Sequence, residues 1–151
     1  MPHVLLKAAT AALALAFMPT ASARAEVLIT KAEAAAPTPG RMAGATRGLT
    51  RGPGIEQLSP NPVQRVASPF AFKVKFVIRN DVPVDPASVK LTYMKAKPID
   101  LTERIKAHIT PGGIAMSEAE VPPGTHILRL DVTDMQGRNG SAIIKLNVAG
   151  M

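Results

Sequence analysis

The sequence predicts an all-β protein, folded as a single antiparallel β-sandwich of about seven short strands with Greek-key connections. From about residue 58, apolar residues recur at every second position, which is typical of strands with one buried face. Clusters of Pro, Gly, Asn and Asp separate these runs at short intervals. No long stretch follows the 3.6-residue period of a helix. At 151 residues without cysteine, the chain has room for one modest domain plus appendages.

Residues 1–25 have the three parts of a secretory signal peptide. Lys7 supplies a positive start, and an apolar run over residues 8–18 follows. This run is too short to span a hydrocarbon core of about 30 Å as a helix. Small residues precede both Arg24 and Glu26, so two cleavage sites fit. We therefore expect a periplasmic or secreted protein that meets the membrane only through the leader, before cleavage.

Residues 26–57 are expected to form a flexible linker rich in Pro, Gly and Arg. Residues 34–54 contain no acidic residue, and Arg41, Arg47 and Arg51 supply positive charge. Such a composition offers little apolar area to offset the entropy of ordering. Two interpretations stay open: a spacer that holds the domain away from a surface, and an Arg-Gly segment that contacts anionic partners.

The first strands of the expected domain, residues 58–149, follow the linker. Alternation in "FAFKVKFVIRN" predicts that Lys73 and Lys75 point to solvent. The predicted inward residues of this strand are Phe72, Val74, Phe76 and Ile78. A turn-forming segment, "NDVPVDPAS", leads to "VKLTYMK", which exposes Lys90. Its predicted inward residues are Val89, Leu91 and Tyr93.

The second half of the domain begins less regularly. Asp100 or Thr102 can cap one helical turn that runs through Ile105, and "TPGGI" predicts a turn whose flanks pair as a small hairpin. Two alternating runs then form a larger hairpin, with Asn139-Gly140 allowing positive backbone φ at its connection. Its predicted inward residues are Leu128, Leu130, Val132, Ala142, Ile144, Leu146 and Val148.

The segment "PPGTHILRLDVTDMQGRNG" resembles the penultimate strand and last hairpin of bacterial immunoglobulin-like domains. "SPFAFKVKF" and "PASVKLTYMK" resemble their second and third strands, so the resemblance covers residues 58–149. It implies an immunoglobulin-like (Ig-like) sandwich that serves as an adhesive, spacer or ligand-presenting module. The chain lacks the Cys pair and Trp of antibody-type domains. His126 stands where many sandwich domains place a corner tyrosine.

The residue types of the predicted mature chain argue against catalysis. It carries two histidines, His108 and His126, and no H-E-x-x-H, G-x-S-x-G or phosphate-binding loop. Ser117 and Ser141 stand in no pattern that marks a nucleophile. We therefore expect a non-enzymatic protein without a cofactor, with an unrecognised hydrolase as one alternative.

Metal binding is the other alternative. Met94, Met116 and Met135 together with the two histidines raise the possibility of a periplasmic copper-binding carrier, although no M-x-x-M cluster occurs. Asp131 and Asp134 lack the ligand spacing of a calcium loop. Asp134 is instead expected to accept hydrogen bonds from backbone amides of the turn.

Charge gives the main functional hypothesis. The formal net charge is +7, and only 3% of residues are aromatic, which favours anionic partners without specific nucleic-acid recognition. We expect an exported binding or spacer module of the bacterial cell envelope that presents a basic surface to a protein or an anionic polymer. The lysines also fit a second role, in which they keep exposed strands from pairing with other chains. The candidate contacts are Arg41, Arg47, Arg51, Lys73, Lys75 and Lys90.

Overall fold

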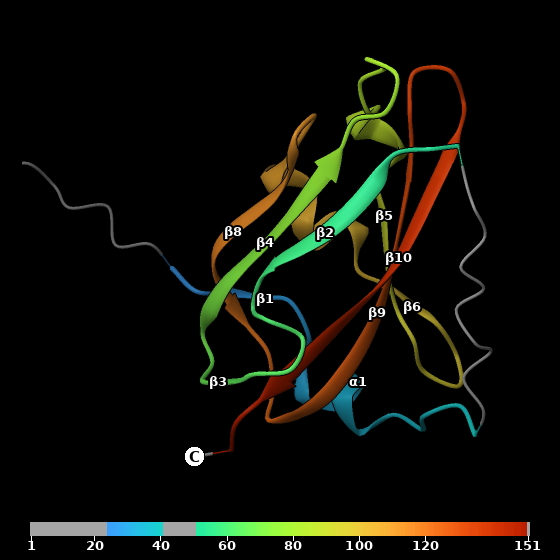
Figure 1. Cartoon of the computed structure of the whole chain (residues 1–151). Helices are drawn as coiled ribbons and strands as arrows, with labels where there is room; N and C mark the ends of the chain where they lie inside the picture. Colours follow the sequence, from blue (N-terminus) through green and yellow to red (C-terminus); the bar gives the residue numbers. More distant parts are fainter. Residues whose placement is uncertain (1–23, 41–50, 151) are drawn as a thin grey trace, which may run out of the picture.

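The computed structural model describes residues 24–40 and 51–150 of the chain (Figure 1). Nearly all of the predicted signal peptide, as well as Arg41 and Arg47, lies outside these residues. The described part is mostly β: two five-stranded sheets face each other as a sandwich. The predicted all-β sandwich is confirmed at this level. Among the described residues no helix is long and apolar enough to cross a membrane.

The first sheet contains strands from the beginning and the middle of the described chain. Its hydrogen-bonded order is β1-β8-β4-β2, with β7 also paired to β8. The strands are β1 (Glu26–Val27), β2 (Gly54–Ser59), β4 (Phe70–Val77), β7 (Ile109–Thr110) and β8 (Gly113–Glu120). Pairing of β1 with β8 is parallel, unlike the other pairings of this sheet.

The second sheet has the order β3-β10-β9-β5-β6. Its strands are β3 (Arg65–Val66), β5 (Lys90–Tyr93), β6 (Ile99–Asp100), β9 (Gly124–Thr133) and β10 (Asn139–Val148). The β3–β10 pairing is parallel, so the expectation of a purely antiparallel sandwich is wrong at two places. The described residues hold ten strands rather than about seven, because the two-residue strands β1, β3 and β6 are too short to show a period.

Most inward residues are placed as predicted. On β4, Phe72, Val74 and Phe76 are buried, and the predicted inward residues of β5 and β9 are buried too. On β10, Ile144, Leu146 and Val148 are buried. Ala142 is only half-buried, and Ile78 is an exception, with 48% of its surface exposed. The prediction fails there because β4 ends at Val77 and the chain turns through Asn80 and Asp81, both with positive φ.

The β9–β10 connection differs from the prediction in one detail. Positive φ occurs at Gly137, whereas Asn139 and Gly140 already pair as strand residues with β9. Gly140 is required for close packing, since a Cβ atom there would lie 2.1 Å from the Pro53 carbonyl oxygen. Asp134 acts as predicted: its Oδ1 accepts hydrogen bonds from the amides of Gln136 (2.9 Å) and Arg138 (3.0 Å).

Short helices fill the connections between strands. The predicted helical turn is α2 (Thr102–Ile105), and Asp100 Oδ1 accepts a hydrogen bond from its first amide. The predicted small hairpin is the β7–β8 pair. A 3-10 turn η1 (Pro86–Ser88) precedes β5, and η2 (Lys106–His108) follows α2. The remaining helix, α1 (Lys31–Ala35), lies near the start of the described chain.

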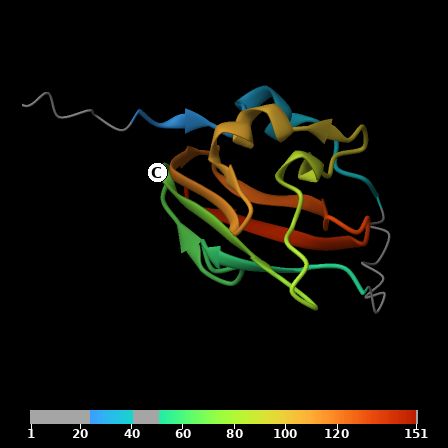
Figure 2. The same cartoon turned by 90° about the horizontal axis from the view of Figure 1, so that it is seen from above.

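Residues 26–37, which we call the strap, pack against the sandwich. They comprise β1, α1 and the segments around them, and Figure 2 shows α1 beside α2. Leu28 and Ile29 are almost completely buried. A flexible linker was expected over residues 26–57. The structure instead packs residues 26–37 against the sandwich, and β2 begins at Gly54 within the same range. The strap is too short to show a hydrophobic period, and its burial depends on partners distant in the sequence.

Candidate functional site

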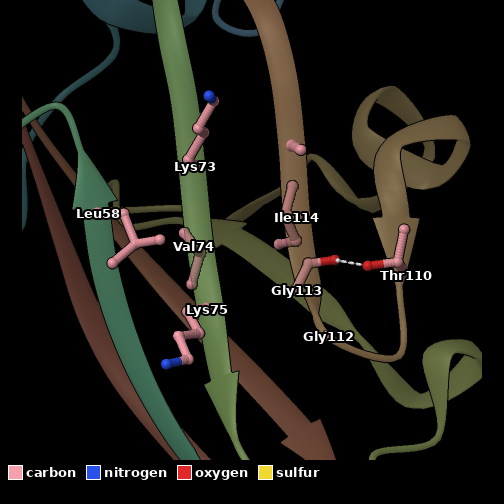
Figure 3. A pocket seen from close by; sticks show the side chains of 9 residues that line it. Leu58, Lys73, Val74, Lys75, Thr110, Gly112, Gly113 and Ile114 are labelled. Carbon is pink, nitrogen blue, oxygen red and sulfur yellow. Dashed lines mark hydrogen bonds between the residues drawn. The ribbon is translucent and has the colours of Figure 1, made fainter.

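A hollow of about 210 Å³ lies on the outer face of the first sheet (Figure 3). Strand β2 borders it on one side, and the turn between β7 and β8 borders it on the other. Small residues of β8 line it beside two lysines of β4. The main lining residues are Leu58, Lys73, Lys75, Thr110, Gly113 and Ala115.

The alternation of β4 places the two lysines here. Val74 lies between them and is buried in the core, so Lys73 and Lys75 both face solvent. Neither lysine forms an ion pair within the described ranges. Glu56 is the cross-strand partner of Lys75 and offsets part of its charge. Lys73 is opposite Ala115, which leaves its charge without an acidic neighbour in that pair.

The other candidate contacts lie elsewhere. Lys90 is on β5 in the second sheet, where it is opposite Asp131 of β9. Arg51 is exposed and precedes Gly52, which packs against the backbone of Asn139. Of the predicted set, the structure therefore brings together Lys73 and Lys75. Periodicity predicted the exposure of these two, and "TPGGI" predicted the turn, but the sequence did not indicate that this turn and Leu58 complete a hollow beside them.

A second hollow, of about 200 Å³, lies between β1 and η2. Here His108 Nε2 is 2.6 Å from Glu26 Oε2. Met116, Ser117 and Glu118 of β8 line the same hollow. Ser117 has no hydrogen bond to His108 in the described part of the chain, so the hydrolase alternative gains no support. Within the same residues, no group of three His, Asp or Glu side chains could hold a metal ion.

His126 is occupied by structural hydrogen bonds. Its exposed fraction is 3%, its Nε2 is 2.8 Å from the Pro122 carbonyl oxygen, and its Nδ1 is 2.8 Å from the Tyr93 hydroxyl. Because a carbonyl only accepts, Nε2 carries the proton, and Nδ1 accepts from Tyr93. Burial lowers the pKa of His126, and the Lys95 ammonium lowers it further, despite the opposing effect of the Pro122 bond. The neutral imidazole thus tethers the corner, as a corner tyrosine would.

Comparisons with known proteins give limited information. No family model matches the chain, and no curated protein matches it. Among solved structures it is similar to CopC from Methylosinus trichosporium OB3b, with 16% sequence identity and a TM-score of 0.43. The match covers 64% of this chain and 93% of that one. This likeness concerns the β-sandwich fold alone.

Proposed function

We propose that this protein is an exported, non-enzymatic binding module of the cell envelope, which holds an anionic partner against the hollow on its first sheet. One observation carries the proposal: Lys73 and Lys75 stand beside the same hollow, exposed and without an ion pair in the described residues. The leader-like residues 1–25 support export to the periplasm or medium. The chain passes several times from one sheet to the other, and this supports an Ig-like sandwich with Greek-key connections.

The spacing of the lysines indicates the chemistry of the partner. Residues two apart on a strand are about 6.6–6.8 Å apart, and the two side chains of Figure 3 diverge along β4. A partner with negative groups repeated at this distance or slightly more can engage both ammonium groups. The small side chains of β8 and the exposed Leu58 leave room for its backbone. An acidic polymer, or an acidic segment of an envelope protein, fits this description.

Polyglutamate is a suitable probe for the test. We expect binding that weakens steeply between about 20 mM and about 150 mM salt, because exposed charges are screened within about 8–10 Å. Lys73→Gln/Lys75→Gln should weaken the binding several-fold. Lys97→Gln/Lys106→Gln removes the same charge from other exposed positions and should have a smaller effect. Equal effects of the two pairs would show attraction by net charge without a site, and would overturn the proposal.

A metal carrier is the second candidate, and the His108–Glu26 contact favours it. Imidazole suits copper, and His108 and Glu26 line the same hollow. Met116 also borders this hollow, but its side chain packs in the core. His126 cannot contribute without losing the bonds that tether the corner. If copper binds here, micromolar copper should raise the melting temperature by mass action, and His108→Gln should abolish this rise. A rise that persists in His108→Gln, or no rise at all, would argue against this site.

A further inference from the structure

A chain of contacts runs from the corner of the sandwich to the strap. His126 on β9 accepts a hydrogen bond from Tyr93 on β5. The ammonium group of Lys95 lies 5.0 Å from the centre of the Tyr93 ring. It donates a hydrogen bond of 2.8 Å to the carbonyl oxygen of Ala34 in α1. His126 and the strap are therefore joined through two side chains.

The charged and titratable groups around His126 come from several elements. Tyr93 and Lys95 face it from β5 and the connection after β5. The corner contributes the uncharged Pro122 carbonyl, and β10 contributes Leu146 as its cross-strand partner. The strap contributes Glu33, whose carboxylate is engaged by Arg104 of α2 in two hydrogen bonds of 2.7 Å. Lys95 is only 8% exposed and has no ion-pair partner among the described residues.

A proton on His126 conflicts with this arrangement. Both ring nitrogens become donors, so the Tyr93 hydroxyl must rotate and accept instead of donating. The imidazolium and the Lys95 ammonium then lie on the same buried phenol, where their repulsion is stronger than in water. Movement of Lys95 into solvent relieves the repulsion, but it breaks the hydrogen bond to Ala34.

We propose that the strap is an acid-released cover: protonation of His126 expels Lys95, and the α1 part of the strap detaches while the sandwich stays folded. Detachment uncovers the surface against which Ala34 packs, whereas Leu28 and Ile29 stay in the core. This inference does not depend on the hollow beside Lys73 and Lys75 or on the metal candidate.

The direction follows from proton linkage. Burial lowers the pKa of His126, and the nearby Lys95 ammonium lowers it further while the strap is docked. Departure of Lys95 removes this second cause, so the released state binds the proton more readily. The ratio of released to docked strap therefore rises as pH falls, by at most tenfold per pH unit for a single proton. Arg104 holds the pKa of Glu33 at about 2. Glu33 therefore adds to release only below its ordinary 4.5, and does not start it.

His108 provides a matched control. It is the other histidine near the strap, and it contacts Glu26 of β1. It takes no part in the contacts that join His126, Tyr93, Lys95 and Ala34. His108→Gln should consequently leave acid release in place.

NMR of the isotopically labelled mature chain can test the proposal between about pH 7.5 and about pH 4.5. The amides of Ala34 and Ala96 report on the strap, since they donate to the carbonyls of Thr30 and Pro37. The amides of Leu130 and Leu146 report on the sandwich. In the wild type and in His108→Gln, we expect the strap signals to move to unstructured positions as pH falls, while the sandwich signals persist.

His126→Gln supplies the decisive comparison. Glutamine can donate to Pro122 and accept from Tyr93 without titrating in this range, so strap release should be lost. Release in His126→Gln at the wild-type pH would overturn the proposal. So would simultaneous loss of strap and sandwich signals, or a strap that stays docked. If His126→Gln does not fold, the imidazole signals of the wild type decide the matter, because their titration must coincide with strap release.

Discussion

The strap and the β9–β10 hairpin bury apolar side chains in the same sandwich, but they do so in different ways. The hairpin pairs Gly124–Thr133 with Asn139–Val148 along their whole length. Its strands are neighbours in the sequence, and every second side chain of β9 from His126 to Val132 is buried. The strap consists of a two-residue strand and a five-residue helix. It is held by residues far along the chain, including Lys95, Arg104 and Glu120.

This difference shows what a hydrophobic period can and cannot reveal. A long strand repeats its pattern often enough to identify both its structure and its buried face. In the strap, one adjacent pair, Leu28 and Ile29, supplies most of the buried apolar surface. Local composition then resembles a linker, although the segment is part of the core.

Deletion of residues 26–37 should have the largest effect on the stability of the protein. Loss of Leu28 and Ile29 alone should cost on the order of 5 kcal/mol or more, a large part of the usual stability of a domain. A thermal melt followed by circular dichroism should show a much lower melting temperature, or no folded protein. An unchanged melting temperature would mean that the strap is a linker, as its composition suggested.

Single truncations compare the two regions directly. Leu28→Ala in the strap and Leu130→Ala in the hairpin should each cost about 2–5 kcal/mol, because both side chains are fully buried. Urea unfolding measures both. Leu58→Ala is the control, since 57% of Leu58 is exposed, and it should cost less than about 0.5 kcal/mol. If Leu28→Ala lowers the free energy of unfolding as little as Leu58→Ala does, the strap does not belong to the core.

Glu33→Gln tests the polar anchor of the strap. It removes charge-assisted bonds to Arg104 and should cost about 1–3 kcal/mol near neutral pH. The folded-state pKa of Glu33 is lowered from 4.5 to about 2, so its stabilisation is complete above 4.5 and is lost as pH falls towards 2. The difference in unfolding free energy between wild type and Glu33→Gln should therefore shrink over this window. A difference independent of pH would assign the effect to packing instead.

Thr30→Ala should have the smallest effect. Thr30 caps α1, where its hydroxyl accepts from the Glu33 amide and Glu33 in turn accepts from the Thr30 amide. Loss of such a cap should cost about 1 kcal/mol, measured by the same urea unfolding. Thr30→Ser keeps the hydroxyl and should restore most of the stability. Equal losses in both variants would show that the methyl group, rather than the cap, matters.

Part of the candidate site was also predictable from local pattern. Alternation on β4 placed Lys73 and Lys75 on the solvent face, and turn chemistry gave Asp134 its role. The corner position of His126 was recognisable from "PPGTH". Its hydrogen bond to Tyr93 was not, because the two residues lie 33 positions apart and no periodic pattern links them.

The sequence by itself determined the long strands, their buried faces and the turns between them, since these depend on side chains within a few residues of one another. The tertiary structure decided the parallel pairings of β1 and β3, the burial of the strap and the hollow beside Lys73. Each of these brings together segments distant in the chain, and each involves elements too short to repeat a pattern. For such elements, the free energy of ordering is offset by contacts with the rest of the sandwich rather than by any local preference.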